Sequence, residues 1–145
     1  MAVPATWRTT TETVLLPARA VAVAEARHHV ARSLAARGVA VSLVADAELV
    51  VSELMANAIR HARPLDGDTV RVIWRVLPAG HADGTPTEIE IAVADGGAPW
   101  FPRVEDPPAD VDNGRGLGIV DTLTAEWGVE GAGSTHQLVW AVLRA

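Results

Sequence analysis

Two alternating segments in the middle of the chain constrain the fold more than any other feature of the sequence. In residues 70–76 and 88–93, apolar side chains recur at every second position, with arginine, glutamate, isoleucine or alanine between them. A period of two is typical of a β-strand that buries one face. The segment 78–86, which contains glycine and proline, joins the two as a hairpin loop. The pattern therefore predicts two neighbouring antiparallel strands.

Helical periodicity occurs on both sides of this hairpin. Apolar side chains recur every three or four residues in 18–37 and in 42–62, which predicts a helix in each segment. Ser42 is a suitable N-cap for the second of these helices. A third helical pattern opens at Gly116.

Strand-like patterns at 13–16, near 127–130 and near 136–143 complete the expected secondary structure. Strands gathered in the middle and at the end of a chain, with helices between them, are typical of an α/β (α+β) two-layer sandwich. We expect a mixed, mostly antiparallel sheet covered on one face by helices. A length of 145 residues suits a single domain, 1–145.

Composition excludes several classes of function. The chain has no cysteine, which rules out a disulfide scaffold, a thiolate nucleophile and cysteine-based metal sites. All 12 basic residues are arginine, so there is no lysine for a Walker-type phosphate loop or a Schiff base. A net charge of −6 argues against binding to a nucleic-acid backbone. With no signal peptide or membrane-spanning run in the sequence, we expect a cytoplasmic protein.

Glu53, Asn57 and His61 recur every four residues and form one polar stripe on the helix predicted for 42–62. One interpretation is a solvated helix face. The other is a nucleotide site, because the amide oxygen of Asn57 is a suitable Mg²⁺ ligand alongside phosphate oxygens and water. Glu53, one turn earlier, would then act on the same phosphates as a general base.

Asp95, Gly96 and Gly97 follow directly after an apolar strand. They suit a plain turn, in which glycine supplies a positive φ. They also suit a ligand site, since a carboxylate at a strand end can accept a hydrogen bond from an exocyclic amine. Glycine would then let a flat ring lie against the backbone.

Glycine alternates with other residues in 113–119, ahead of the third predicted helix. Free backbone N–H groups and the positive end of a helix favour an anion there, and Arg115 adds positive charge. The dinucleotide-binding fingerprint does not fit, because a loop rather than a strand precedes the segment and Ile119 stands at the third glycine position. The Walker loop does not fit, because it requires a lysine. The segment is therefore either a flexible hinge or a phosphate site of another kind.

The order of these three motifs resembles that of the GHKL nucleotide-binding superfamily, which has the Bergerat fold. Residues 48–62 look like the N-box of the bacterial anti-sigma-factor serine kinases, and the resemblance covers nearly the whole chain. It implies a protein-serine kinase that uses ATP and Mg²⁺. It further implies that the protein sequesters a sigma factor and phosphorylates a small anti-sigma antagonist, without contacting nucleic acid or membrane. Kinases of this family are commonly homodimers.

The resemblance also assigns roles to individual positions. Asn57 matches the magnesium-binding asparagine and Glu53 the general base. Asp95 matches the aspartate that recognises the adenine amino group, and Gly97 matches the glycine of the same motif. Gly114, Gly116 and Gly118 match the glycine-rich box around the phosphates, and 98–113 matches the ATP lid. Thr135 is the candidate for the late threonine, and we also expect His61, Arg115 and Leu117 at the nucleotide.

Some departures from the family pattern leave alternatives open. Ala98-Pro99 stands where the family has a second glycine. Thr135 is the candidate for the family's late threonine, but it lies too far from the end of the last strand, and Leu138 is the alternative residue for that position. His61 suits packing or capping as well as phosphate contact. A non-catalytic ATP-binding module that acts by sequestration, and a simple ATPase switch, are the alternative functions.

Overall fold

The computed structural model describes residues 11–78, 86–97 and 111–144. Within these residues the chain forms three helices and five strands. In chain order they are β1 (Glu12–Pro17), α1 (Ala22–Ala36), α2 (Val41–His61), β2 (Thr69–Pro78), β3 (Pro86–Asp95), α3 (Val111–Leu123), β4 (Glu126–Glu130) and β5 (Gln137–Arg144).

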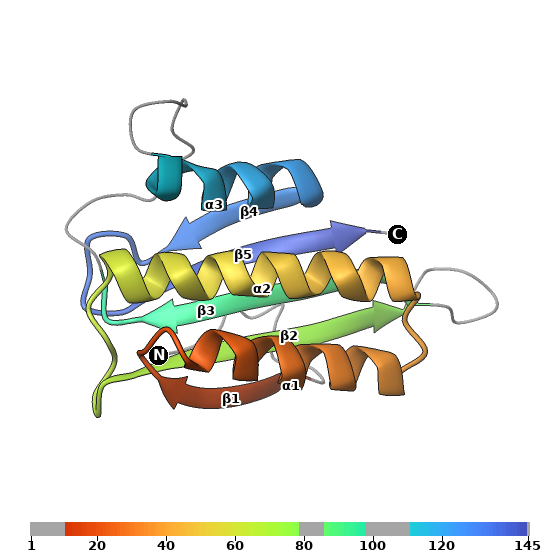
Figure 1. The fold of residues 1–145 in the computed structure, drawn as a ribbon, viewed down its shortest axis with the longest axis horizontal. Coiled ribbons are helices and arrows are strands. Elements are labelled where there is room, and N and C mark those ends of the chain that lie inside the picture. Colours follow the sequence, from red (N-terminus) through yellow and green to blue (C-terminus); the bar gives the residue numbers. More distant parts are fainter. Residues whose placement is uncertain (1–10, 79–85, 98–110, 145) are drawn as a thin grey trace.

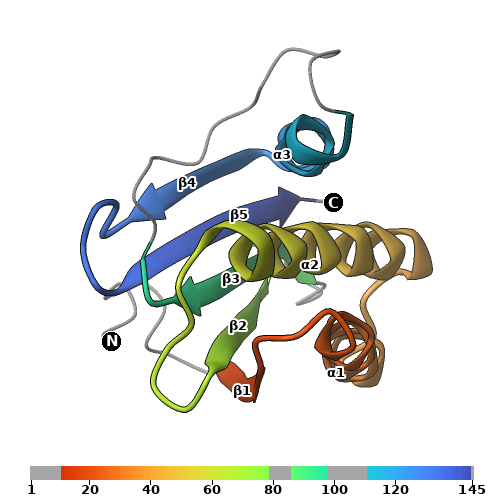
Figure 2. The ribbon, with the colours of Figure 1, turned by 60° about the vertical axis from the view of Figure 1, so that its left-hand side comes forward.

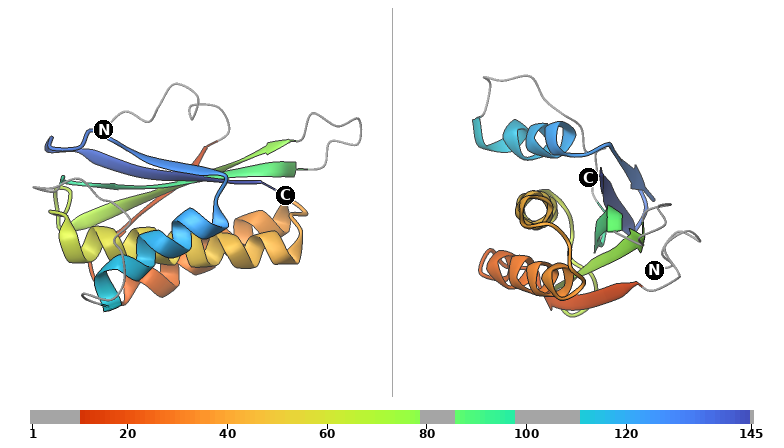
Figure 3. Two further views of the ribbon diagram at one scale, coloured as in Figure 1. Left: turned by 90° about the horizontal axis from the view of Figure 1, so that it is seen from above. Right: turned by 90° about the vertical axis from the view of Figure 1, so that its right-hand side faces the viewer.

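The strands form one sheet in the order β1-β2-β3-β5-β4. The predicted hairpin is present as β2 and β3, in which Val72 pairs with Val93. All three helices cover the same face of the sheet, and α2 lies between α1 and α3 (Figure 1, Figure 3). The prediction of an α+β two-layer sandwich is thus confirmed. Every pairing among the described strands is antiparallel, so the sheet is not mixed.

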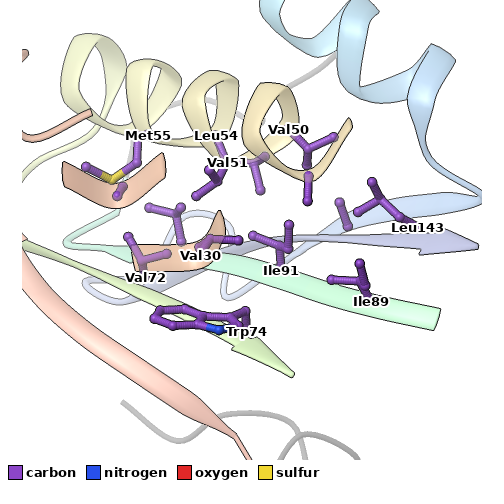
Figure 4. Packing of buried hydrophobic residues seen from close by; sticks show 14 of the residues in the cluster. Val30, Val50, Val51, Leu54, Met55, Val72, Trp74, Ile89, Ile91 and Leu143 are labelled. Carbon is purple, nitrogen blue, oxygen red and sulfur yellow. The ribbon is translucent and has the colours of Figure 1, made fainter. Parts of the chain in front are cut away.

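The main core lies between the helices and the sheet. α2 contributes the largest set of buried side chains, at helical spacing: Leu43, Ala47, Val50, Val51, Leu54, Met55 and Ala58. In Figure 4, the labelled side chains of α2, which are Val50, Val51, Leu54 and Met55, point toward the strands below, where Val72, Ile89 and Ile91 lie. Removal of this apolar surface from water is the main force that holds the two layers together.

The helix boundaries differ from those predicted. α1 begins at Ala22 rather than at 18. The residues before it form a turn, and the N–H of Ala18 donates to the carbonyl of Asp68, in the segment before β2, at 2.8 Å. α2 begins one residue before the proposed N-cap Ser42, and its N-cap is Ala40 without a side-chain hydrogen bond. The helix is thus stabilised by its buried face rather than by a cap.

The face of the sheet that the helices leave uncovered carries a second, smaller apolar cluster. It contains the buried residues Ile73, Ala92, Ala94 and Leu138. The buried ion pair Arg75–Glu90 lies on the same face, since side chains two residues apart on a strand point the same way. None of the described helices is long and apolar enough to cross a membrane.

Candidate functional site

The C-terminal end of α2 is joined to the end of β3 by two backbone hydrogen bonds. The N–H of Arg63 donates to the carbonyl of Gly97 at 2.8 Å, and the N–H of Gly96 donates to the carbonyl of Arg63 at 2.6 Å. The last turns of α2 therefore lie beside Asp95. Two of the predicted motifs, far apart in the sequence, meet at this junction.

The polar stripe of α2 lies on the flank of the helix rather than in its buried face. Glu53, Asn57 and His61 are each half-buried. Their spacing of four residues aligns them along the helix toward the junction with β3. His61, the member of the stripe closest to Arg63 in the chain, has an interaction partner in the structure. The stripe therefore extends from the junction back along α2.

Both glycines after Asp95 are in close contact with other parts of the backbone. A Cβ atom on Gly96 would lie 2.2 Å from the carbonyl oxygen of Pro64, and one on Gly97 would lie 1.9 Å from that of Ser134. Gly97 also has a φ of 94°, as the turn interpretation predicts. Packing against two neighbouring loops is thus a sufficient reason for glycine at both positions.

Asp95 has an unusual electrostatic environment. Its side chain is only 1% exposed, and its Oδ1 accepts a hydrogen bond from the N–H of Gly97 at 2.7 Å. Its Oδ2 has no hydrogen-bond partner among the described residues. Burial raises the pKa of Asp95 from 3.8 to about 6, while hydrogen bonds from Gly97 and from the side chain of Gln137 act in the opposite direction. The unpaired oxygen is therefore a strong acceptor for a ligand N–H group.

Gln137 lies directly across from Asp95 in the pairing of β3 with β5. Both side chains belong to the sheet face covered by the helices, because Val93 and Val139, two residues away on each strand, lie in the main core. Gln137 is 1% exposed, and its Oε1 also has no partner among the described residues. The sequence motifs do not identify this residue: the alternation of the last strand predicts its face, but only the register of β5 against β3 places it opposite Asp95.

The two positions proposed for the late threonine differ from Gln137. Leu138 lies on the opposite face of the sheet, in the small apolar cluster, so its side chain points away from Asp95. Thr135 is exposed, and its hydroxyl lies 3.2 Å from Nδ1 of His136.

The glycine-rich segment has a different conformation from the one predicted. α3 begins at Val111, so the prediction that this helix opens at Gly116 is wrong. Gly114 and Gly116 lie within the helix. Glycine lowers the stability of a helix by about 1 kcal/mol relative to alanine, which is too little to prevent the helix from forming. Only the first four N–H groups of an α-helix lack a partner within it. The N–H groups of Gly116 and Gly118 are therefore directed at carbonyls of the preceding turn.

α3 packs beside α2 on the helical face of the sheet (Figure 1, Figure 2). Leu117 is buried and Gly118 half-buried. The backbone of Arg115 is helical, and its side chain lies outside what the structure describes. Of the expected lid, 98–110 lies outside the described residues, and 111–113 form the start of α3.

No group of three or more histidine, aspartate or glutamate side chains is arranged to hold a metal ion within the described residues. The metal ligand expected from the sequence is instead a single amide, Asn57. One protein ligand is compatible with Mg²⁺, which keeps several waters and takes its other ligands from phosphate groups.

Residues 16–140 match the family model described as a histidine kinase-like ATPase domain. A search of curated proteins gave no match to this chain. Among solved structures, the RsbU and RsbW domains of Rv1364c from Mycobacterium tuberculosis are 18% identical with a TM-score of 0.64, covering 94% of this chain and 32% of that chain. The histidine kinase domain of the Erythrobacter litoralis EL346 blue-light activated histidine kinase is 22% identical with a TM-score of 0.42, covering 73% of this chain and 46% of that chain.

The likeness to the Mycobacterium tuberculosis structure shows a shared fold, and this chain spans about a third of the length of that protein chain. The family match, by contrast, covers most of the sequence, including the polar stripe of α2, Asp95 and the glycines of α3. The chain therefore belongs to the histidine kinase-like ATPase domain family, with the GHKL-type fold that its motifs imply.

Proposed function

We propose that this chain is an ATP-dependent protein-serine kinase domain of the anti-sigma type. It transfers the γ-phosphoryl group of ATP to a serine of a small antagonist protein and sequesters a sigma factor. Membership of an ATPase-domain family supports ATP binding and phosphotransferase-type chemistry. The observation that carries the proposal is the hydrogen-bonded junction between α2 and β3, which joins the Glu53–Asn57 stripe to the unpaired carboxylate oxygen of Asp95.

The described residues fit a bound adenine nucleotide at its base end. The Oδ2 atom of Asp95 is a buried acceptor without a donor, and the adenine amino group supplies a donor. Asn57 Oδ1 would provide one ligand for Mg²⁺, and Arg115 a positive charge for the phosphates. Mg²⁺ held there by Asn57 would neutralise charge on the phosphates.

The proposed chemical step needs one base from the chain. The serine Oγ forms a bond to the γ-phosphorus as the bond from that phosphorus to the bridging oxygen of ADP breaks, and the serine proton passes to the Glu53 carboxylate. Glu53 is half-buried on the flank of α2, one turn before Asn57, so proton acceptor and metal ligand come from the same helix. The helix holds their spacing constant.

The partners belong to the same proposal. Similarity to a structure that contains an RsbW domain is in line with a regulatory role, and we expect a sigma factor and an anti-sigma antagonist as protein partners in the cytoplasm. A homodimer is the expected assembly. One domain spanning 1–145 would be sufficient for nucleotide binding and transfer.

Substitutions on α2 test the proposed roles separately. Glu53→Gln should keep ATP affinity and lose phosphotransfer, since the amide cannot take up the serine proton. Asn57→Ala should lose the Mg²⁺-dependent part of ATP binding in calorimetry. Glu48→Gln, on another side of the same helix, is the matched control and should behave as the wild type.

Labelled ATP distinguishes this proposal from its alternatives. Label on a serine of a small partner protein supports the kinase. ATP-dependent partner binding without label would favour a sequestering module, and release of phosphate alone would favour an ATPase switch. Transfer by Glu53→Gln at the wild-type rate would contradict the role of Glu53 as the base.

A further inference from the structure

We propose that Gln137 is a second base-recognising residue of the nucleotide site. In this arrangement the Oε1 atom of Gln137 and the Oδ2 atom of Asp95 each accept one of the two hydrogens of the adenine amino group. The inference rests on the proposed ATP site and goes beyond it by assigning specificity to a residue that no motif comparison reached.

Two buried acceptors lie on one pair of facing strands, β3 and β5. Asp95 Oδ2 and Gln137 Oε1 are the buried side-chain polar atoms without a hydrogen-bond partner among the described residues. Both belong to side chains that are 1% exposed. A buried acceptor without a donor destabilises a fold, so native proteins keep few of them. That both occur on one pair of facing residues indicates a site built for a ligand.

The strand pairing places the two acceptors together. Asp95 and Gln137 are opposite each other in the register of β3 and β5, and both point to the helical side of the sheet. Side chains that face each other in an antiparallel pair have their Cβ atoms about 4.5–5.5 Å apart. One small group can therefore contact both side chains.

The Gln137 amide contributes an acceptor to this pair. Its Oε1 has no hydrogen-bond partner among the described residues. A carboxylate accepts hydrogen bonds, so the NH₂ end of an amide is the end that suits the side of Asp95. Oε1 is therefore the end of Gln137 that is left for a ligand.

An exocyclic amino group is the ligand chemistry that satisfies both acceptors, because it carries two hydrogens on one nitrogen. A keto oxygen in the same place, as in guanine or hypoxanthine, would add a third buried acceptor. A site of buried acceptors discriminates strongly against a ligand that leaves them unpaired. The pair Asp95–Gln137 therefore favours adenine over 6-keto purines.

The test is a double-mutant cycle between protein and ligand, measured as binding affinity by calorimetry. The ligands are ATP and purine riboside triphosphate, which lacks the amino group. Wild type should bind purine riboside triphosphate about 30-fold or more weakly than ATP. Gln137→Met, which keeps the length of the side chain and removes the acceptor, should reduce this ratio by about 2- to 10-fold. The exposed Glu130→Gln substitution at the end of β4 should leave the ratio unchanged.

A series of ligands keeps the test independent of whether Gln137→Met folds. N6-methyl-ATP retains one hydrogen on the amino nitrogen, so wild type should bind it more weakly than ATP. Equal binding of N6-methyl-ATP and ATP by wild type would overturn the assignment of two acceptors. Two results would overturn the role of Gln137 and leave the proposed function intact. In the first, folded Gln137→Met has the wild-type ratio of affinity for ATP to affinity for purine riboside triphosphate. In the second, Thr135→Val lowers this ratio and Gln137→Met does not. Wild type that binds no ATP would overturn both.

Discussion

The raised pKa of Asp95 predicts a specific dependence of stability on pH. A group whose pKa is higher in the folded protein than in the unfolded chain binds its proton more tightly in the fold. Its contribution to stability is therefore present at low pH and lost as the pH rises through its folded pKa, here about 6. A shift from 3.8 to about 6 corresponds to at most about 3 kcal/mol of destabilisation once the carboxylate is fully ionised.

Asp95→Asn removes the charge and keeps an oxygen that can accept the hydrogen bond from Gly97. At pH 8 the variant should gain up to about 3 kcal/mol of unfolding free energy relative to wild type, and near pH 4 this relative gain should fall below about 1 kcal/mol. The NH₂ group of asparagine adds an offset that is independent of pH. The test is therefore how the difference in unfolding free energy between Asp95→Asn and wild type changes with pH, not how large this difference is at one pH.

Urea unfolding of both proteins at intervals from pH 4 to pH 8 measures this difference. Asp66→Asn, at an exposed turn position, is the matched control and should show a difference from wild type that hardly varies with pH. If the difference between wild type and Asp95→Asn stayed constant across the range, the burial of an ionisable carboxylate at this site would be refuted. The same variant should bind ATP weakly at every pH, since its amide presents an N–H to the adenine amino group.

Two glycine substitutions give further predictions. Gly118→Ala should raise the unfolding free energy by about 1 kcal/mol and Tm by about 3 °C in scanning calorimetry, because its Cβ would meet nothing within 4 Å and alanine favours a helix. It should also weaken ATP binding if the first turns of α3 unwind to contact phosphate, and unchanged affinity would count against that contact. Gly97→Ala should lower the unfolding free energy by about 2–4 kcal/mol in urea, because of its positive φ and the carbonyl of Ser134; a loss below about 1 kcal/mol would contradict the packing described here.

Much of the fold could be predicted because it depends on local periodicity. The alternation in 70–76 and 88–93 specifies both the strands and the face that each buries, and the pairing of Val72 with Val93 agrees with it. The start of α1 could not be predicted in this way. It depends on the hydrogen bond between Ala18 and Asp68, two residues that are 50 positions apart in the numbering.

The sequence pattern places the start of α3 too late when glycine is taken as a helix boundary. Gly114 and Gly116 each cost a helix only about 1 kcal/mol. Burial of Leu117 and Val120 against the rest of the protein is worth more than that. Local propensity was outweighed here by tertiary packing, which the sequence pattern alone does not quantify.

The candidate site was predicted in its parts rather than in its assembly. Motif order identified Glu53, Asn57 and Asp95, whose roles remain predictions. It did not identify Gln137, because the register of β5 against β3 must be known before residue 137 can be placed opposite residue 95. Nor did it indicate that Gly96 and Gly97 are required by the carbonyls of Pro64 and Ser134.

The two hydrogen bonds between Arg63 and the glycines after Asp95 have a mechanical consequence. They hold the end of a long helix against the end of a central strand, so Asn57 and Asp95 are carried on two elements that are bonded to each other. α3 is held at its far end, where the N–H of Ala125 donates to the carbonyl of Val142 at 2.8 Å, and its glycines gather at the opposite end. In the proposed site, a nucleotide would lie between the α2–β3 junction and α3. Adjustment of the protein to the length of the nucleotide would then take place in the glycine-containing turns of α3, because glycine permits more backbone conformations than other residues.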